Sequence, residues 1–154
     1  MDLSPLKRIS IGSDHGGYDL KEVLRRRLKD KGFVVLDRGC DAPTPVDYPD
    51  IASIVCGDVV GGKADAGILI CGTGIGMSYA ANKIKGIVAA LCTNEYMARM
   101  ARAHNDANVL VLGGRVLGDE LAWSITETFL TTGPMDDQKY VRRRDKVRRM
   151  EEVG

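Results

Sequence analysis

Apolar runs and amphipathic stretches alternate along the whole chain. Five short runs rich in β-branched residues, each bounded by glycine or charged residues, predict buried strands. These strands are expected at residues 8–13, 33–37, 66–70, 87–92 and 109–112. Stretches with helical spacing follow each of them. The first helix should open at a capping box, 19–22, and stop before Gly32, and the others should cover 51–60, 77–83, 94–103, 118–131 and 139–152.

Strands that alternate with helices form right-handed crossovers, so they lie parallel in one sheet with helices on both faces. We therefore expect an α/β fold, a Rossmann-like three-layer α/β/α sandwich with a five-stranded parallel sheet and a C-terminal helix. The 154 residues fit one domain, 1–154, with an adequate core. Its last helix, 139–152, is strongly basic.

The stretch 66–82, AGILICGTGIGMSYAAN, is the most informative part of the chain. Its strand ends at Cys71 and runs into Gly72, Gly74 and Gly76 before the next helix. Glycines let the backbone turn sharply and expose its N–H groups, and a helix N-terminus adds partial positive charge. The turn therefore predicts an anion cradle, and a thiol at its mouth is expected to have a lowered pKa. The alternative is a glycine-rich turn beside an inert, buried cysteine.

The spacing of this turn does not fit three familiar motifs. A Walker loop needs Lys and then Ser or Thr after its last glycine, whereas Met77 and Ser78 follow here. A dinucleotide fingerprint needs glycine or alanine at its sixth position, which Met77 or Tyr79 occupies in the two possible frames. A cysteine phosphatase needs arginine where Met77 stands. A thiol beside backbone donors that suit a developing oxyanion is the interpretation that fits.

Polar or charged residues follow several of the predicted strands: Asp14, His15, Tyr48, Cys71 and Arg115. The carboxyl ends of parallel strands share one edge of the sheet, and ligands bind beyond that edge. Each residue taken alone could be a cap, a packing residue or a surface charge. Their convergence on one edge favours a binding site.

His104 should lie at the opposite edge, because it precedes the strand predicted at 109–112. A five-residue strand separates the two edges by roughly 16 Å, so His104 is not expected to reach Cys71 of its own chain. It is therefore either a structural histidine or a residue that serves the site of a neighbouring subunit.

Composition narrows the function classes. The net charge of +1 and the 5% of aromatic residues show no basic bias toward nucleic acid, and no apolar stretch approaches the ~18 residues of a membrane span. The first eight residues lack the apolar core of a signal peptide. Four scattered cysteines without a C-x-x-C pair suggest reduced thiols in the cytoplasm rather than disulfides or a zinc site.

Several patches resemble the ribose-5-phosphate isomerase B family, which also contains the galactose-6-phosphate isomerase subunits. They are SDHGGYDLK at 13–21, VDYPD at 46–50, GILICGTGIGMSYAANK at 67–83, CTNEYMARMARAHNDANVLVLGGRVLG at 92–118, and Arg143. The patches span nearly the whole chain up to Leu130. The resemblance implies strand order 2-1-3-5-4 and homodimers, sometimes tetramers, with active sites built from two subunits.

The resemblance also implies interconversion of D-ribose 5-phosphate and D-ribulose 5-phosphate through an enediolate, without a metal or cofactor. Cys71 is then the base, and His104 of the partner subunit opens the furanose ring. Asp14 handles hydroxyl protons, and Thr73 helps the backbone to hold the enediolate oxygen. The implied substrate contacts are His15, Tyr48, Gly72, Gly74, Ile75, Gly76, Asn105, Arg115 and Arg143.

The chain departs from the family before its last helix, where members usually carry Gly-Gly-Arg-His and this chain has residues 137–140, Asp-Gln-Lys-Tyr. Lys139 keeps a positive charge for the substrate but loses the two-pronged geometry of arginine. This leaves two alternatives, an isomerase of allose or galactose 6-phosphate and a non-catalytic partner subunit. Cys71 together with His104 favours ribose. In the run 142–144, the two arginines beside Arg143 fit either a solvated helix face or anion contacts.

Overall fold

Five parallel strands form the centre of the computed structural model, which describes residues 6–153. They are β1 (Arg8–Ser13), β2 (Val34–Asp37), β3 (Ala66–Cys71), β4 (Ala89–Leu91) and β5 (Val109–Gly113). Their order, β2-β1-β3-β5-β4, is the one that the resemblance implied, and all neighbouring pairs are parallel. The prediction of a Rossmann-like α/β fold is confirmed. The ends of the expected domain, residues 1–5 and 154, lie outside the described residues.

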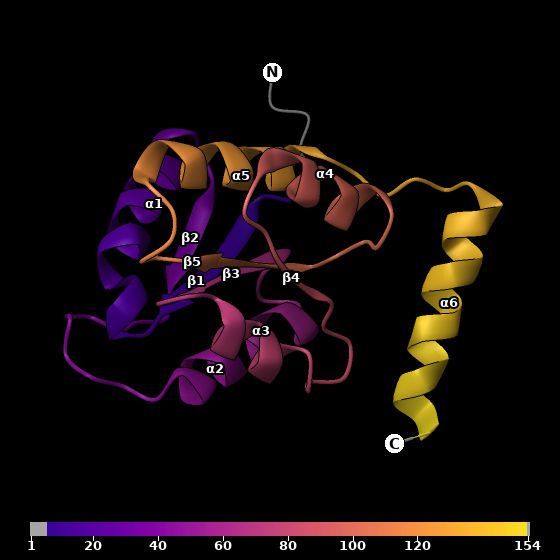
Figure 1. Ribbon diagram of the computed structural model, residues 1–154, viewed down its shortest axis with the longest axis horizontal. Coiled ribbons are helices and arrows are strands. Elements are labelled where there is room, and N and C mark those ends of the chain that lie inside the picture. The colour runs from indigo at the N-terminus through magenta and orange to yellow at the C-terminus, as the bar shows by residue number, and fades with distance from the viewer. Residues whose placement is uncertain (1–5, 154) are drawn as a thin grey trace.

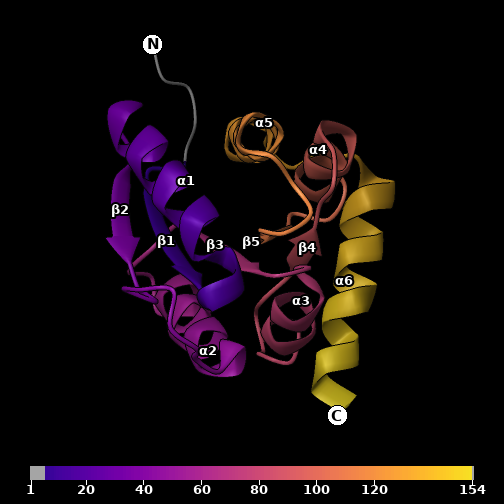
Figure 2. The ribbon, with the colours of Figure 1, turned by 60° about the vertical axis from the view of Figure 1, so that its left-hand side comes forward.

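Six α-helices and one 3₁₀ turn complete the described part of the chain. They are η1 (His15–Gly17), α1 (Tyr18–Asp30), α2 (Tyr48–Val60), α3 (Ile75–Ala81), α4 (Glu95–Ala103), α5 (Asp119–Thr131) and α6 (Gln138–Val153). Helices α1, α4 and α5 cover one face of the sheet, and α2 and α3 cover the other (Figure 1, Figure 2). Helix α6 belongs to neither layer and lies beyond the β4 edge.

Each face of the sheet has its own apolar core, because successive side chains of a strand point to opposite faces. Ile68 and Leu110 enter the core beneath α1, α4 and α5. Their neighbours Leu69 and Val111 enter the core shared with α2 and α3. All four side chains are fully buried. The central strands β3 and β5 are therefore covered on both sides, as their continuous apolar runs predicted.

Helix α1 begins one residue before the predicted capping box and takes no cap from Asp19. The chain enters the helix through η1, and Asp14 caps that turn by accepting a hydrogen bond from the Gly16 N–H at 2.9 Å. The N-cap of α1 is Gly17, which provides no side-chain hydrogen bond. The helix stops before Gly32, whose φ of +93° suits glycine, so the predicted stop is confirmed.

Helices α2 and α3 begin two or more residues earlier than predicted, and both shifts involve site residues. Helix α2 starts at Tyr48, before the predicted start at residue 51, because Pro49 fits a first helical turn where its missing N–H costs nothing. Helix α3 starts at Ile75 rather than at Met77, directly after Gly74 with its φ of +86°. Tyr48 and Ile75 therefore stand on helix starts and not in loops.

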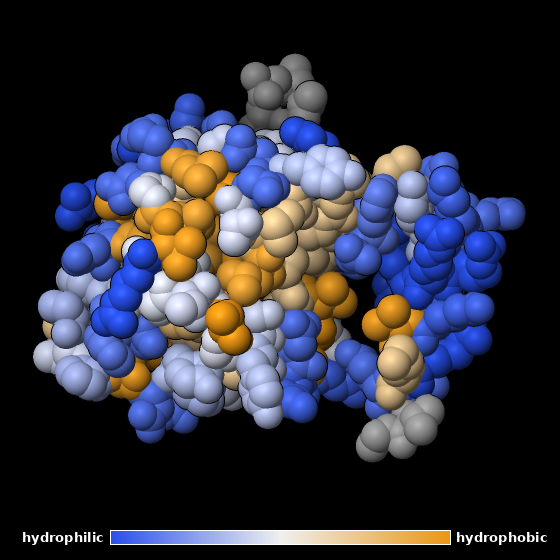
Figure 3. Space-filling model, viewed as in Figure 1, coloured by the Kyte–Doolittle hydropathy of each residue, from blue (hydrophilic) through white to orange (hydrophobic). Residues whose placement is uncertain are grey.

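The basic helix predicted at 139–152 is α6, and it stands apart from the two helical layers (Figure 1). The Met135 N–H, in the segment before it, donates to the Ala103 carbonyl at 2.9 Å, and the Gly86 N–H donates to Glu151 at 3.3 Å. Most of the helix surface is hydrophilic, with apolar groups on the side toward the body (Figure 3). No helix within residues 6–153 combines the length and apolar character needed to cross a bilayer.

Candidate active site

The loops that follow β1, β3 and β5 meet at the carboxyl edge of the sheet, as predicted. The Gly114 N–H donates to the Cys71 carbonyl at 2.8 Å. A Cβ atom on Gly16 would lie 3.0 Å from the Gly72 nitrogen, and one on Gly114 would lie 2.7 Å from the Gly16 oxygen. The three turns therefore touch backbone to backbone, an approach that requires glycine. We call residues 71–76 the cradle.

Cys71 presents its sulfur to the turn that follows it. The Gly74 N–H donates to Cys71 Sγ at 3.2 Å, and the Cys71 residue is 5% exposed. The Thr73 hydroxyl accepts from the Ile75 N–H at 3.1 Å. The family resemblance assigned the backbone N–H groups of this turn to an enediolate oxygen. Two of them are engaged within the cradle: the Gly74 N–H contacts the sulfur, and the Ile75 N–H contacts Thr73.

The other cysteines lie in different surroundings. Burial raises the pKa of the Cys56 thiol to about 11 and that of the Cys92 thiol to about 11. The Cys40 sulfur lies 3.9 Å from the Ser13 hydroxyl. All four cysteines fall within the described residues and are free thiols. A backbone donor on the sulfur sets Cys71 apart from Cys56 and Cys92.

Asp14 and His15 reach the cradle from the end of β1. Asp14 is 8% exposed, and its N–H donates to the Ile70 carbonyl at 3.1 Å, which fixes the turn beside the end of β3. His15 is exposed, and its Nδ1 accepts from the Val46 N–H at 3.4 Å. His15 therefore links this turn to the loop that leads into α2.

Tyr48 and Arg115 contact different glycines of the cradle. The Tyr48 ring packs so closely against the first turn of α3 that a Cβ atom on Gly76 would lie 2.9 Å from it. The Arg115 N–H donates to the Gly72 carbonyl at 3.0 Å, and its guanidinium lies beside the same glycine. Asp14, His15, Tyr48 and Arg115 are thus brought together around Cys71, as predicted.

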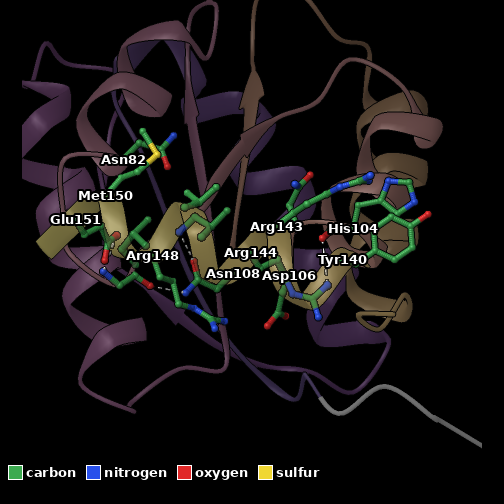
Figure 4. A pocket seen from close by; sticks show the side chains of 15 residues that line it. Asn82, His104, Asp106, Asn108, Tyr140, Arg143, Arg144, Arg148, Met150 and Glu151 are labelled. Carbon is green, nitrogen blue, oxygen red and sulfur yellow. Dashed lines mark hydrogen bonds between the residues drawn. The ribbon is translucent and has the colours of Figure 1, made fainter. Parts of the chain in front are cut away.

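A second group of predicted residues lines a pocket of about 650 Å³ between α6 and the segments 82–88 and 104–108 (Figure 4). We call it the tail pocket; His104, Asn105 and Arg143 line it. The rings of His104 and Tyr140 are stacked, with centroids 4.3 Å apart and planes inclined by 13°. Figure 4 shows these rings and Arg143 gathered at one end of the pocket.

Lys139 is not one of the described residues that line the tail pocket. Its ammonium lies 5.0 Å from the centre of the Tyr140 ring. A cation in this place is attracted by the face of the ring. The predicted substrate contact from Lys139 therefore competes with a contact inside the tail itself.

Two further arginines lie near His104: the sequence analysis left the role of Arg144 open and missed Arg102. Arg144 is half-buried and donates to the His104 carbonyl at 3.1 Å, so it is not part of a solvated face. Arg102 is buried on α4. The sequence could have indicated its burial, because Arg102 shares the buried face of that helix with Ala98 and Ala101, where a charged residue is unusual.

The cradle and the tail pocket lie at opposite edges of the sheet in one chain. Cys71 pairs with Gly113, the last residue of β5. His104 precedes Val109, the first residue of the same strand. The separation that the chain order predicted is therefore confirmed, and one chain does not bring Cys71 and His104 together.

Residues 9–147 match the sequence profile of the ribose/galactose isomerase family. Both the cradle and the His104 end of the tail pocket fall within this range.

Individual proteins agree with this match. Ribose-5-phosphate isomerase B of Escherichia coli is 47% identical over 125 residues, 81% of this chain and 84% of that protein. The 4-deoxy-4-sulfo-D-erythrose isomerase of a Clostridium species is 42% identical over 127 residues, 82% of this chain and 80% of that protein. The solved structure of Clostridium thermocellum ribose-5-phosphate isomerase B has a TM-score of 0.92 at 49% identity, covering 95% of this chain and 98% of that one. The chain therefore belongs to the ribose/galactose isomerase family and is an isomerase.

Proposed function

We propose that the chain interconverts D-ribose 5-phosphate and D-ribulose 5-phosphate, with Cys71 as the base and an enediolate as the intermediate. The observation that carries the proposal is the hydrogen bond from the Gly74 N–H to the Cys71 sulfur. A donor aimed at sulfur stabilises the thiolate, which is the form that can remove a proton. The names of the E. coli and C. thermocellum relatives support ribose 5-phosphate as the substrate.

In this mechanism, the Cys71 thiolate removes the proton from C2 of the open-chain aldose. The electron pair of that C–H bond forms the C1–C2 double bond, and the carbonyl oxygen on C1 becomes negatively charged. The thiol then returns the proton to C1, while Asp14 transfers the proton of the C2 hydroxyl to the oxygen on C1. The product is the ketose, with no net gain or loss of protons or electrons. Because the Gly74 and Ile75 N–H groups are engaged within the cradle, the N–H groups of Gly72, Thr73 and Gly76 hold the charged oxygen.

His104 acts in this proposal from the partner subunit, where it opens the furanose ring before proton transfer. The opposite placement of Cys71 and His104 within one chain supports this assignment. A symmetric homodimer then contains two composite sites, each with the cradle of one chain and the tail pocket of the other. Asn105 and Tyr48 position the sugar, and a tetramer would repeat the same pair of sites.

The phosphate is held by His15 and Arg115 from the cradle side and by Arg143 from the tail of the partner subunit. Arginine suits this task because its planar fork matches the geometry of phosphate oxygens. Lys139 contributes a weaker, mobile charge, since its ammonium also lies over the Tyr140 ring.

The position of Lys139 also favours a second candidate, a sugar whose terminal group carries a single negative charge. A phosphate ester carries about 1.5 to 2 negative charges near neutral pH and depends more strongly on several cations. The Clostridium relative is named for a sulfonated four-carbon sugar, and a sulfonate is singly charged. Allose and galactose 6-phosphate form a third group of candidates.

The substrate is tested by measuring turnover across ribose 5-phosphate, allose 6-phosphate, galactose 6-phosphate, erythrose 4-phosphate and 4-deoxy-4-sulfo-D-erythrose. We expect the highest kcat/KM for ribose 5-phosphate. A higher value for a six-carbon or sulfonated sugar would replace the substrate but keep the reaction class. If none of the five sugars is isomerised, the proposal is contradicted.

The role of His104 is tested by comparing a substrate that closes a ring with one that cannot. Ribose 5-phosphate closes a furanose ring, whereas erythrose 4-phosphate cannot, because its C4 oxygen carries the phosphate. His104→Asn should lower kcat for ribose 5-phosphate by about 10²-fold, the scale of general acid–base catalysis, and lower it much less for erythrose 4-phosphate. Equal losses on both substrates would refute ring opening as the role of His104.

A further inference from the structure

Arg102, near the end of α4, is 4% exposed and joins two segments that are distant in sequence. Its Nη1 donates to the Ala107 carbonyl at 2.6 Å and to the Asp106 carboxylate at 3.2 Å. Its Nε donates to the Thr132 carbonyl at 3.0 Å. Arg102 therefore ties residues 104–108, the turn that carries His104, to the start of the segment that leads to α6.

Arg144, on α6, contacts the same turn from the tail pocket (Figure 4). Its Nη1 donates to the His104 carbonyl at 3.1 Å, and its Nη2 donates to the Met135 carbonyl at 3.0 Å. The Met135 N–H in turn donates to the Ala103 carbonyl at 2.9 Å. The turn, the connecting segment and α6 are thus joined in a closed set of contacts.

We propose that Arg102 and Arg144, here called the arginine clamp, are positioning residues that hold the His104 ring in place against the tail residues Tyr140 and Arg143. This inference rests on the proposed role of His104. Within the described residues, the hydrogen bonds of the clamp go to the protein's own carbonyl and carboxylate oxygens, and the Arg102 guanidinium also lies 5.6 Å from the centre of the Phe129 ring. The clamp therefore acts through His104 and not on the substrate.

The chemistry of arginine explains why it occupies both positions. Its planar fork presents several donors at fixed angles, so one side chain can satisfy acceptors from two different segments. In this turn Asp106 has a φ of +50°, in the left-handed region that Asp adopts more readily than most other non-glycine residues. Without Arg102, the Ala107 carbonyl loses a donor in a buried place, and the turn would move to find another.

The stacked rings provide a signal that needs no substrate. The sequence contains two histidines, His15 and His104, so NMR can follow each imidazole separately. A ring stacked at 4.3 Å shifts the His104 Cε1 proton upfield, and Tyr140→Leu should move it back downfield. We expect Arg102→Met and Arg144→Met to move this signal in the same direction and to leave the His15 signal in place.

The matched control is Arg142→Met, which removes the same charge from an exposed position on the same helix. It should leave both histidine signals unchanged. Arg102→Lys keeps the charge but not the fork, so it should restore part of the His104 shift. If Arg102→Met does not fold, Arg144→Met and Arg102→Lys still decide the question.

Kinetics then separate positioning from general stability. Turnover of ribose 5-phosphate should fall roughly tenfold to hundredfold in the clamp variants, because a displacement of about 1 Å can cost that much. Turnover of erythrose 4-phosphate should fall less, since it requires no ring opening. A purely structural effect would lower the turnover of both substrates by the same factor. Ile125→Val, in the core beneath α5, is the control for such an effect.

The outcomes for the clamp and for the proposed function can be distinguished. Folded clamp variants whose His104 signal matches that of Arg142→Met would overturn the inference. A displaced His104 signal with unchanged turnover of ribose 5-phosphate would also overturn it, because turnover would then not depend on the position of the ring. A wild-type protein without isomerase activity would refute the proposed function instead, and the NMR comparison would still decide whether the clamp holds the ring.

Discussion

The cradle and the tail pocket are held in place by different kinds of contact. At the cradle, three turns meet backbone to backbone, and a Cβ atom on Gly16 or Gly114 would press against the backbone of Gly72 or Gly16. In the tail pocket, side chains make the contacts: Arg144 reaches two carbonyls, and Tyr140 stacks on His104. The first arrangement is built on the sheet, and the second joins α6 to it.

This difference indicates how each region responds to change. Backbone contacts at a sheet edge leave few alternatives, so substitution of a cradle glycine should disturb the geometry as well as the chemistry. Side-chain contacts on a helix that stands apart can be weakened one at a time. The cradle therefore suits the proton transfer, which needs a fixed base, and the tail suits recognition, which can vary between related isomerases.

The largest expected effect is the loss of the base in the cradle. Cys71→Ala should lower turnover of ribose 5-phosphate by at least ~10²–10⁴-fold, the range of proton-transfer catalysis, while circular dichroism remains unchanged. Cys56→Ala is the matched control, because burial raises the pKa of Cys56 to about 11 and keeps that thiol protonated. Near wild-type turnover in Cys71→Ala would exclude the proposed mechanism.

A glycine in each region tests the difference in rigidity. Gly74 has a φ of +86°, and a Cβ atom there would run into Leu91 and lie 3.3 Å from the Leu112 oxygen. The left-handed conformation alone costs about 1–2 kcal/mol in other residues, so Gly74→Ala should lower Tm by about 4 °C or more and reduce turnover strongly. Gly133→Ala, in the segment before α6, faces open space and should change neither. Similar results for the two variants would contradict the comparison.

In the tail, removal of one cation should affect substrate affinity and not the chemical step. Arg143→Ala should raise KM for ribose 5-phosphate roughly tenfold, because a charge-assisted hydrogen bond contributes about 1.5–3 kcal/mol. Lys139→Ala should raise KM less, and Lys139→Arg should lower it by restoring the fork. Unchanged KM in Arg143→Ala would leave phosphate binding to His15 and Arg115 alone.

The smallest effect concerns the ion pairs that support the cradle side of the fold. Arg25 donates to Glu22 at 2.6 Å and, with Lys21, lowers the pKa of that carboxyl to about 2. A lowered folded pKa means that this stabilisation is complete above the usual value of 4.5 and disappears as the pH falls toward 2. Wild type should therefore melt above Glu22→Gln at pH 6, and the gap in Tm should close near pH 2. Glu127→Gln, exposed on α5, is the control; a gap independent of pH would refute the assignment.

Much of this arrangement could be predicted from local pattern. The apolar run before Cys71 and the glycines after it identified a buried strand and the turn that follows. Because chain order in a β/α fold determines the edge at which each loop emerges, it also placed Cys71 and His104 at opposite edges. Helix starts were less predictable: Tyr48 and Ile75 were expected in loops, since the proline and glycine beside them are compatible with either state.

The rest depends on contacts between distant segments. Arg102 received no role from the sequence, because its partner Thr132 belongs to a connection with no pattern of its own. The stack of Tyr140 on His104 depends on where that connection places α6. Strand β4 is Ala89–Leu91, shorter than the predicted 87–92, and just before its start the Val88 N–H donates to the Asn108 side chain at 2.9 Å. None of these contacts leaves a periodic signal.

The central claim, that one site takes Cys71 from one chain and His104 from another, is tested most directly by mixing two inactive variants. Cys71→Ala and His104→Asn are denatured together and refolded, and the presence of heterodimers is verified by native mass spectrometry. Each heterodimer then contains one intact site, so an equal mixture of a symmetric dimer should regain about a quarter of wild-type turnover of ribose 5-phosphate. A mixture that contains heterodimers but stays as inactive as its two parents would show that both residues act within one chain.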